Sequence, residues 1–185
     1  MTTESIDAEC LDLTRNLRRR GAIVLAVFGL VWALAGGSGV AAAAVAVGVV
    51  AAAVTAGAVV VAFRGTRGPV TRTVRLPEKW NRGVGLVNTA ELVAIFAVIA
   101  ASNASGHPEL IPVGICLVVG LHFFPLARLF DQPQYRWTAI LLTALALVGL
   151  AVLAAGASAE TIRAVVGLGA AAVLWGSSFH VALRG

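Results

Sequence analysis

Charged residues are scarce in this sequence and make up only 12% of its 185 positions. Ordinary soluble domains carry about 25% charged residues. Hydrophobic residues account for 59% of the chain. Because a water-soluble fold of this size could not hide so much apolar surface, the composition predicts an integral membrane protein.

Cysteine is nearly absent, with Cys10 in the polar N-terminal segment and Cys116 inside an apolar run. The two should lie on different sides of a membrane boundary, so neither a disulfide nor a metal site is expected. The chain also lacks the GxSxG, P-loop, CxxC and HExxH signatures, and no acidic pair has the spacing that suits Mg²⁺. The sequence therefore predicts no cofactor and disfavours metal-dependent chemistry.

Long apolar runs are what the chain has in abundance, and a run of about 20 residues crosses a hydrocarbon core of about 30 Å. Six runs qualify, and they predict transmembrane helices at about 21–36, 40–63, 83–102, 109–130, 137–156 and 160–183. Acidic residues before the first run, without a convincing cleavage site, favour a retained helix over a signal peptide. We expect an all-α, six-helix membrane bundle over 21–185, preceded by a cytoplasmic segment at 1–20.

Basic residues gather at one end of the predicted spans. Thirteen of the fourteen Lys and Arg residues fall on one side, and the connections on the other side carry only Arg163. The positive-inside rule makes the basic side cytoplasmic. It therefore predicts cytoplasmic N and C termini and a multi-pass protein of the bacterial inner membrane. The formal charge of +5 then reflects topology, and we expect no nucleic-acid partner.

Small residues recur every four positions along the second span, at Ala44, Gly48, Ala52 and Ala56. Such a ridge allows another helix backbone to approach closely. We interpret it as a packing face within the bundle, and the alternative is a contact between two copies of the chain. The sequence leaves the oligomeric state open.

Two ionisable residues lie inside predicted spans, where they are costly and usually face a bundle interior. Glu91 stands 8 residues into the third span, and His122 stands 8 residues before the inner end of the fourth. Since the two spans are antiparallel and a helix rises 1.5 Å per residue, both should lie about 12 Å from the cytoplasmic boundary. Asn88 precedes Glu91 by three residues and shares its helix face.

Two interpretations of this polar stripe remain open. The three residues could form an interhelical hydrogen-bond clamp, which model systems value at about 1 kcal/mol or less. Alternatively, burial away from water lets the carboxyl group of Glu91 keep or exchange a proton, with His122 as its acid–base partner. On that hypothesis Glu91 and His122 are catalytic and Asn88 contacts the substrate.

Further candidate residues surround the inner ends of the fourth, fifth and sixth spans. Polar residues after Arg128 indicate either a solvated turn or the cytosolic mouth of a cavity. Aromatic faces there could stabilise a cationic ligand or intermediate, although Trp175 and His180 also fit an interfacial aromatic belt. Pro125 removes a backbone donor and predicts a kink beside His122. Besides Asn88, the expected substrate-binding residues are Phe123, Phe124, Arg128, Tyr135, Trp175, Ser178 and His180.

The stretch 120–130, Gly-Leu-His-Phe-Phe-Pro-Leu-Ala-Arg-Leu-Phe, is followed by Pro133 and Tyr135. It resembles a G-x-H-F-x-P-L-A-x-x-F signature of small, uncharacterised multi-span bacterial membrane proteins, which implies a helical bundle and no particular activity. A looser likeness exists to compact integral-membrane terpene cyclases. That likeness implies metal-independent cyclisation started by a carboxylic acid, a role to which Glu91 would correspond.

Three functions fit these residues. The first is a metal-independent acid–base enzyme, of terpene-cyclase type, that acts on a lipid-soluble, isoprenoid-like substrate with Glu91 as proton donor. The second is a proton-coupled small-molecule transporter, and the third is a structural or accessory membrane protein. Because the polar groups cluster in the inner half and the outer half offers almost none, a one-sided site favours the enzyme. The expected partners are the lipid bilayer and a hydrophobic small molecule.

Overall fold

The protein is built from six long helices, which a computed structural model describes over residues 3–65, 76 and 78–184. They are α1 (Thr3–Gly37), α2 (Ala44–Gly65), α3 (Trp80–Ala104), α4 (Leu110–Leu129), α5 (Gln134–Ala154) and α6 (Ala159–Arg184), with a short 3₁₀ turn, η1 (Ala41–Ala43), before α2. No strand occurs in these residues. All six helices are long and apolar enough to cross a bilayer. The chain is therefore an all-α, multi-pass membrane protein in contact with lipid.

The six helices coincide with the six predicted spans, and the largest difference in bounds is at the first of them. Hydropathy starts that span at residue 21, whereas α1 already begins at Thr3. Residues 3–20 therefore continue the first helix. Asp12 and Arg15 lie one turn apart there, with Oδ1 3.6 Å from Nη1. Ion pairs at this spacing stabilise a polar helix. Hydropathy does not detect such a helix because its residues are not apolar.

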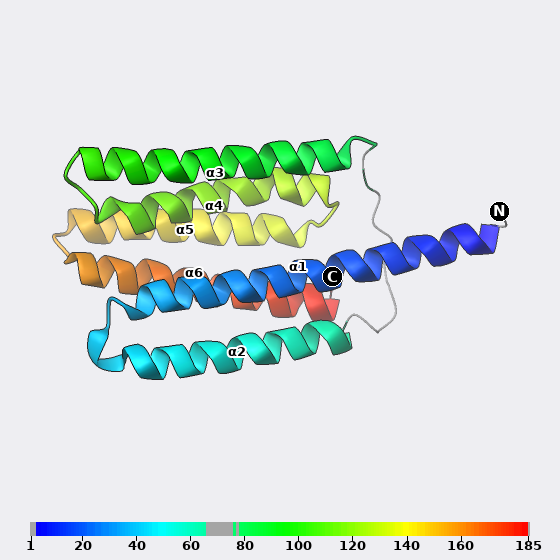
Figure 1. The fold of residues 1–185 in the computed structure, drawn as a ribbon, viewed down its shortest axis with the longest axis horizontal. Helices are drawn as coiled ribbons and strands as arrows, with labels where there is room; N and C mark the ends of the chain where they lie inside the picture. The colour runs from blue at the N-terminus through cyan, green and yellow to red at the C-terminus, as the bar shows by residue number, and fades with distance from the viewer. Residues whose placement is uncertain (1–2, 66–75, 77, 185) are drawn as a thin grey trace.

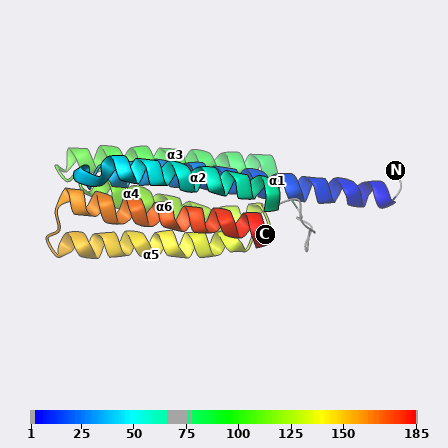
Figure 2. The same ribbon diagram turned by 90° about the horizontal axis from the view of Figure 1, so that it is seen from below.

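Consecutive helices run in opposite directions along the long axis of the bundle (Figure 1). α3 and α2 form its two edges, and α4, α5, α6 and α1 lie between them (Figure 1). In the view turned by 90°, α5 lies along one face and α3 along the opposite face (Figure 2). Both chain ends lie at the same end of the bundle, where α1 extends beyond its neighbours (Figure 1).

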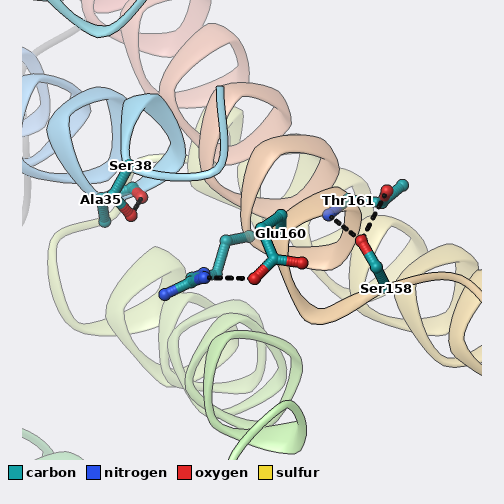
Figure 3. Close-up of polar contacts among 6 residues, drawn as sticks. Ala35, Ser38, Ser158, Glu160 and Thr161 are labelled. Carbon is teal, nitrogen blue, oxygen red and sulfur yellow. Dashed lines mark hydrogen bonds and ion pairs between the residues drawn. The ribbon is translucent and has the colours of Figure 1, made fainter. Parts of the chain in front are cut away.

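We call this end of the bundle the basic end. Its described Lys and Arg residues are Arg15, Arg18, Arg19, Arg20, Arg64, Lys79, Arg82, Arg128, Arg136 and Arg184. At the opposite end, Nη2 of Arg163 lies 3.2 Å from Oε1 of Glu160, so this cation is locally neutralised (Figure 3). The remaining predicted loop cations, Arg67, Arg72 and Arg75, lie outside the described residues. Charge is therefore strongly asymmetric along the bundle axis.

Local contacts end the helices at the opposite end of the bundle (Figure 3). The backbone N–H of Thr161 donates to Oγ of Ser158 over 3.3 Å, which satisfies one of the free amides in the first turn of α6. Oγ of Ser38 donates to the carbonyl of Ala35 over 2.6 Å. Each bond spans only three residues, so these contacts terminate helices without joining one helix to another.

The most extensive helix contact joins α1 and α6. A Cβ atom on Gly167 would lie 2.5 Å from Cα of Gly36, and a Cβ atom on Gly36 would lie 2.7 Å from the backbone nitrogen of Leu168. Small residues permit this backbone approach, which maximises van der Waals contact between helices in lipid. The two glycines are therefore required at this crossing.

The packed face of α2 differs from the predicted ridge. Its buried residues are Ala51, Thr55, Ala58 and Ala62. Ala44 and Gly48 of the predicted ridge are half-buried, whereas Ala52 and Ala56 are exposed, so the interpretation of that ridge as the packing face is wrong over its second half. The face that packs contains Thr55, whose Oγ1 accepts a hydrogen bond from the indole of Trp175. The packed face of α2 is thus made of alanine and threonine, and a hydrogen bond to α6 joins it to the bundle.

Candidate functional site

The candidate site lies between α3 and α4, at the edge of the bundle. α3 packs mainly against α4, and Ser102 is its one fully buried residue. The contacts that set the register between the two helices are Gly83 with Leu129, Glu91 with His122, and Val98 with Gly114. These contacts advance along α3 while they step back along α4. Antiparallel neighbours therefore hold the two ionisable residues at the same depth.

Glu91 and His122 face each other across this interface. Oε2 of Glu91 lies 3.4 Å from Nε2 of His122. The side chain of His122 is 9% exposed and that of Glu91 is 23% exposed. The structure thus brings together the acid and the imidazole that the sequence predicted to meet, and it leaves the acid partly open on the outer side of the interface.

The pair is neutral as a whole when it holds one proton. A net charge at bilayer depth is costly, so this state is the favoured one. The proton can sit on the carboxyl oxygen of Glu91 or on the ring nitrogen of His122, and the net charge is the same in both forms. The separation of 3.4 Å exceeds that of a strong charge-assisted bond, about 2.7–2.9 Å. The geometry therefore favours neither position of the proton.

The second ring nitrogen of His122, Nδ1, is buried and has no hydrogen-bond partner of normal geometry in the described part of the chain. The backbone carbonyl of Val87, one turn before Glu91, contributes to the polar surroundings of the imidazole. An unsatisfied buried polar group costs about 1–3 kcal/mol.

Pro125 lies inside α4, three residues after His122. Proline has no backbone N–H, so the carbonyl of Leu121 lacks its usual partner four residues later. α4 nevertheless continues to Leu129. An additional backbone acceptor is therefore available next to His122 without an interruption of the helix.

Asn88 is exposed, and its side chain makes no hydrogen bond with another residue that the structure describes. The structure therefore gives Glu91 and His122 a direct contact, and the amide stands outside that contact one turn away. A substrate-binding role for Asn88 stays a prediction, which its exposed position near Glu91 suits.

An aromatic chain connects the pair to the basic end. The ring of Phe123 lies edge-on to His122, at 5.9 Å between centroids, and to Tyr135, at 5.7 Å. Phe130 continues the chain, at 6.2 Å from Tyr135 and 5.4 Å from Trp80. Edge-to-face pairs of this kind stabilise packing. Phe130 was not among the expected binding residues. In the sequence it was marked only by its position as the last aromatic residue of the 120–130 motif.

Phe124 and Arg128 lie on a different surface from the acid–base pair. With Pro125 and Arg136 they line a surface cavity of about 370 Å³ at the basic end of α4 and α5. Both arginines are exposed. Two of the predicted binding residues thus share a cavity of their own.

The predicted binding residues of α6 are not brought to the pair. Nε1 of Trp175 donates to a backbone carbonyl of α1 over 3.2 Å and to Oγ1 of Thr55 over 3.1 Å. Oγ of Ser178 donates to another carbonyl of α1 over 2.7 Å, and His180 is exposed. Since Trp175 and Ser178 face α1 and α2, their contacts join helices, and a role in binding stays a prediction for all three.

Neither cysteine belongs to the candidate site. Cys10 is exposed, whereas Cys116 is buried, with its thiol directed at the carbonyl of Leu142 over 3.4 Å. Within residues 3–65, 76 and 78–184, no three His, Cys, Asp or Glu residues are grouped so that they could hold a metal ion. The carboxyl and imidazole groups of the pair are therefore the titratable groups that the site itself offers.

One family model matches the chain, over residues 82–178, and its description is "Family of unknown function (DUF7010)". The match covers slightly more than half of the 185 residues and includes both Glu91 and His122. No curated protein and no solved structure matches the chain. The matched segment contains all of α4 and α5 and most of α3, which together build the surroundings of the pair.

Proposed function

Because the chain belongs to this family of unknown function (DUF7010), we propose its activity from the chemistry of the site. Glu91 and His122 act as a metal-independent acid–base pair on a lipid-soluble, isoprenoid-like substrate that approaches from the bilayer. The observation that carries this proposal is the 3.4 Å contact between a carboxyl and an imidazole group at bilayer depth, with the carboxyl side partly exposed.

The position of α3 supports access from lipid. Because α3 packs mainly against α4, most of its surface borders the hydrocarbon region. Glu91 is 23% exposed beside that surface. A hydrophobic molecule dissolved in the bilayer therefore reaches the carboxyl group without passing through water. The exposed amide of Asn88, one turn away, supplies a polar contact that orients the molecule.

In the proposed reaction, Glu91 donates its proton to a carbon–carbon double bond. A C–H bond forms, the neighbouring carbon becomes cationic, and the pair acquires one negative charge. The two opposite charges stabilise each other strongly in a medium of low dielectric constant. After rearrangement or ring closure, the cation loses a proton from an adjacent carbon and the pair accepts it, with His122 sharing the proton. The net reaction is an isomerisation or cyclisation.

The charge asymmetry of the bundle supports an orientation. By the positive-inside rule we assign the basic end, and with it both termini, to the cytoplasm of a bacterial cell, and the protein to the inner membrane. In this orientation the segment 1–20 is cytoplasmic and residues 21–185 form the membrane domain. Glu91 then lies about 16 Å along α3 from Trp80, well below the headgroups.

Deuterium incorporation tests the proposal. Membranes containing the wild-type protein, Glu91→Gln or His122→Ala are incubated in D₂O, and their extracted lipids are analysed by mass spectrometry for carbon-bound deuterium. We expect incorporation with the wild type and a loss of at least about 100-fold with Glu91→Gln, the contribution typical of general acid–base catalysis. Glu160→Gln and His107→Ala, which alter exposed groups of the same kinds, should behave as the wild type.

Equal carbon-bound incorporation with the wild type and with Glu91→Gln would contradict the enzyme. The second candidate is a proton-coupled transporter, favoured by Pro125 inside the helix that carries His122. It predicts that Glu91→Gln abolishes proton flux into liposomes and that no membrane lipid acquires deuterium. A structural or accessory role predicts that Glu91→Gln and His122→Ala change stability alone.

A further inference from the structure

We propose that the surface cavity at the basic end of α4 and α5 binds the phosphate group of an anionic membrane phospholipid. We call it the arginine pocket, and its lining residues are Phe124, Pro125, Arg128 and Arg136. Its volume of about 370 Å³ falls within the range of small-ligand sites, about 300–1,000 Å³. The proposal is independent of any chemistry at Glu91.

The arginine pocket lies at the depth where phospholipid headgroups begin. Arg128 stands in the last turn of α4, and Arg136 stands in the first turn of α5. Both helices cross the bilayer, so their adjoining ends meet the boundary between hydrocarbon and headgroups. Basic pockets between helices at such a boundary bind anionic headgroups.

The two arginines have unused binding capacity. Neither Arg128 nor Arg136 forms an ion pair with a carboxylate among the described residues, in contrast to Arg163, which pairs with Glu160. A guanidinium group presents five N–H donors in a planar fork that fits two phosphate oxygens at once. Two such groups around one cavity therefore match a phosphate group in charge and geometry.

The remaining wall of the arginine pocket is apolar. Phe124 is 39% exposed and Pro125 adjoins it, so a hydrocarbon surface lies directly beside the two cations. Trp137, which follows Arg136, is 69% exposed and adds the aromatic surface typical of a membrane interface. An occupant that carries both a phosphate and acyl chains satisfies both halves of the cavity. This favours a phospholipid over free inorganic phosphate.

Lipid binding to the purified full-length protein tests the proposal. In an uncharged detergent, native mass spectrometry compares phosphatidylglycerol with phosphatidylcholine of the same acyl chains, and inorganic phosphate is added as a competitor in a third arm. We expect the wild type to bind phosphatidylglycerol at least tenfold more tightly. Removal of each arginine should weaken this binding about fivefold, so that Arg128→Gln with Arg136→Gln weakens it about 25-fold.

Matched variants separate the pocket from the general charge of the basic end. Arg64→Gln with Arg82→Gln removes two exposed arginines of the same end outside the cavity, and we expect less than a threefold change. Arg128→Lys with Arg136→Lys keeps the positive charges but removes the planar guanidinium donors. The affinity of this variant for phosphatidylglycerol should therefore lie between those of the wild type and the glutamine variant. This lysine variant decides the question if the glutamine variant does not fold.

Three results would overturn the proposal. The first is unchanged binding of phosphatidylglycerol after removal of the pocket arginines. The second is an equal loss in the Arg64 and Arg82 control, which would assign the preference to the diffuse field of the basic end. The third is competition by inorganic phosphate at concentrations comparable with the lipid, which would make the site one for free phosphate. Glu91→Gln should bind as the wild type, so failure here leaves the proposed acid–base function untouched.

Discussion

The contact between α1 and α6 and the contact between α3 and α4 are held together in different ways. Where α1 crosses α6, glycine backbones touch, and buried hydrogen bonds from Trp175 and Ser178 tie the helices together. Where α3 meets α4, Ser102 is the one fully buried residue of α3, and the interface contains an acid and an imidazole. The bundle thus has a tightly packed side and an edge where one helix can separate at lower cost.

This difference suggests that one helix contact stabilises the bundle and that the other holds the proposed site. Helix association in lipid depends on close van der Waals packing and interhelical hydrogen bonds, because lipid removes most of the hydrophobic driving force. Stability should therefore depend mainly on α1 and α6. The proposed acid–base site, which would admit a molecule from the bilayer, lies at the looser contact with Glu91 and His122.

The largest effect should come from a methyl group added where α1 and α6 touch. In Gly167→Ala, the new Cβ would lie 2.5 Å from Cα of Gly36, so the helices must separate. We expect the free energy of unfolding to fall by about 3 kcal/mol, at the upper end of overpacking effects. Unfolding by SDS of the detergent-solubilised protein measures it. Gly176→Ala, on the same helix with open space around it, is the control, and equal stability of the two variants would refute the tight contact.

A smaller loss should follow removal of one indole N–H on the tightly packed side. Trp175→Phe keeps the ring and deletes the donor that bonds to α1 and to Thr55. We expect a loss of about 1 kcal/mol, the usual value for an interhelical hydrogen bond. Trp137→Phe, at an exposed indole, should change the free energy of unfolding by much less in the same assay. Indistinguishable variants would show that the bonds of Trp175 do not hold the helices.

Neutralisation of the acid at the loose edge should affect stability less than either change. Glu91→Gln retains polar atoms opposite His122, and we expect the free energy of unfolding to change by less than about 1 kcal/mol. Proton transfer should nevertheless be lost. A destabilisation as large as that of Gly167→Ala would instead make the pair a structural clamp. Asn88→Ala, at an exposed position on the same helix, provides the reference for α3.

The smallest effect concerns an ion pair outside the spans. Nδ1 of His107 lies 2.9 Å from Oε1 of Glu109. Two hydrogen bonds to the Glu109 carboxylate lower its pKa: the larger contribution comes from the backbone N–H of Glu109 itself, and the smaller comes from the side chain of His107. The resulting stabilisation is present above the ordinary glutamate pKa, about 4.3, and is lost as the pH falls through the lower folded value.

We therefore expect the unfolding temperature of the wild type to fall slightly more steeply below about pH 4.3 than that of Glu109→Gln. Thermal scans between about pH 6 and pH 3 in one detergent measure both slopes. Parallel curves would show that the contact does not stabilise the fold. Because both residues border the loop between α3 and α4, the result also shows how firmly that edge is closed at its far end.

The number of spans and the meeting of Glu91 with His122 could be predicted because both follow from local properties. Hydropathy marks where a helix enters lipid, and the rise per residue then gives the depth of each side chain. Rotation of a helix about its own axis is different, since depth does not determine it. Trp175 lies at a depth comparable to that of Glu91, yet it faces α1 and α2.

The orientation of α2 shows why rotation could not be derived. It consists mostly of alanine, valine and glycine, so hydropathy alone does not separate the packed side from the lipid side. The choice depends on Thr55 and Trp175, which are 120 residues apart in the chain. The arginine pocket was missed as a unit for a similar reason, because Arg128 and Arg136 come from two helices whose relative rotation has no signal in the sequence.

The pairing of the imidazole with the carboxyl group is tested most directly by ¹⁵N magnetic resonance of histidine-labelled protein in bilayers. The ring-nitrogen signals of His122 should differ between the wild type and Glu91→Gln, while those of His107 and His180, which lie away from Glu91, stay unchanged. Identical His122 signals in the two proteins would contradict the account.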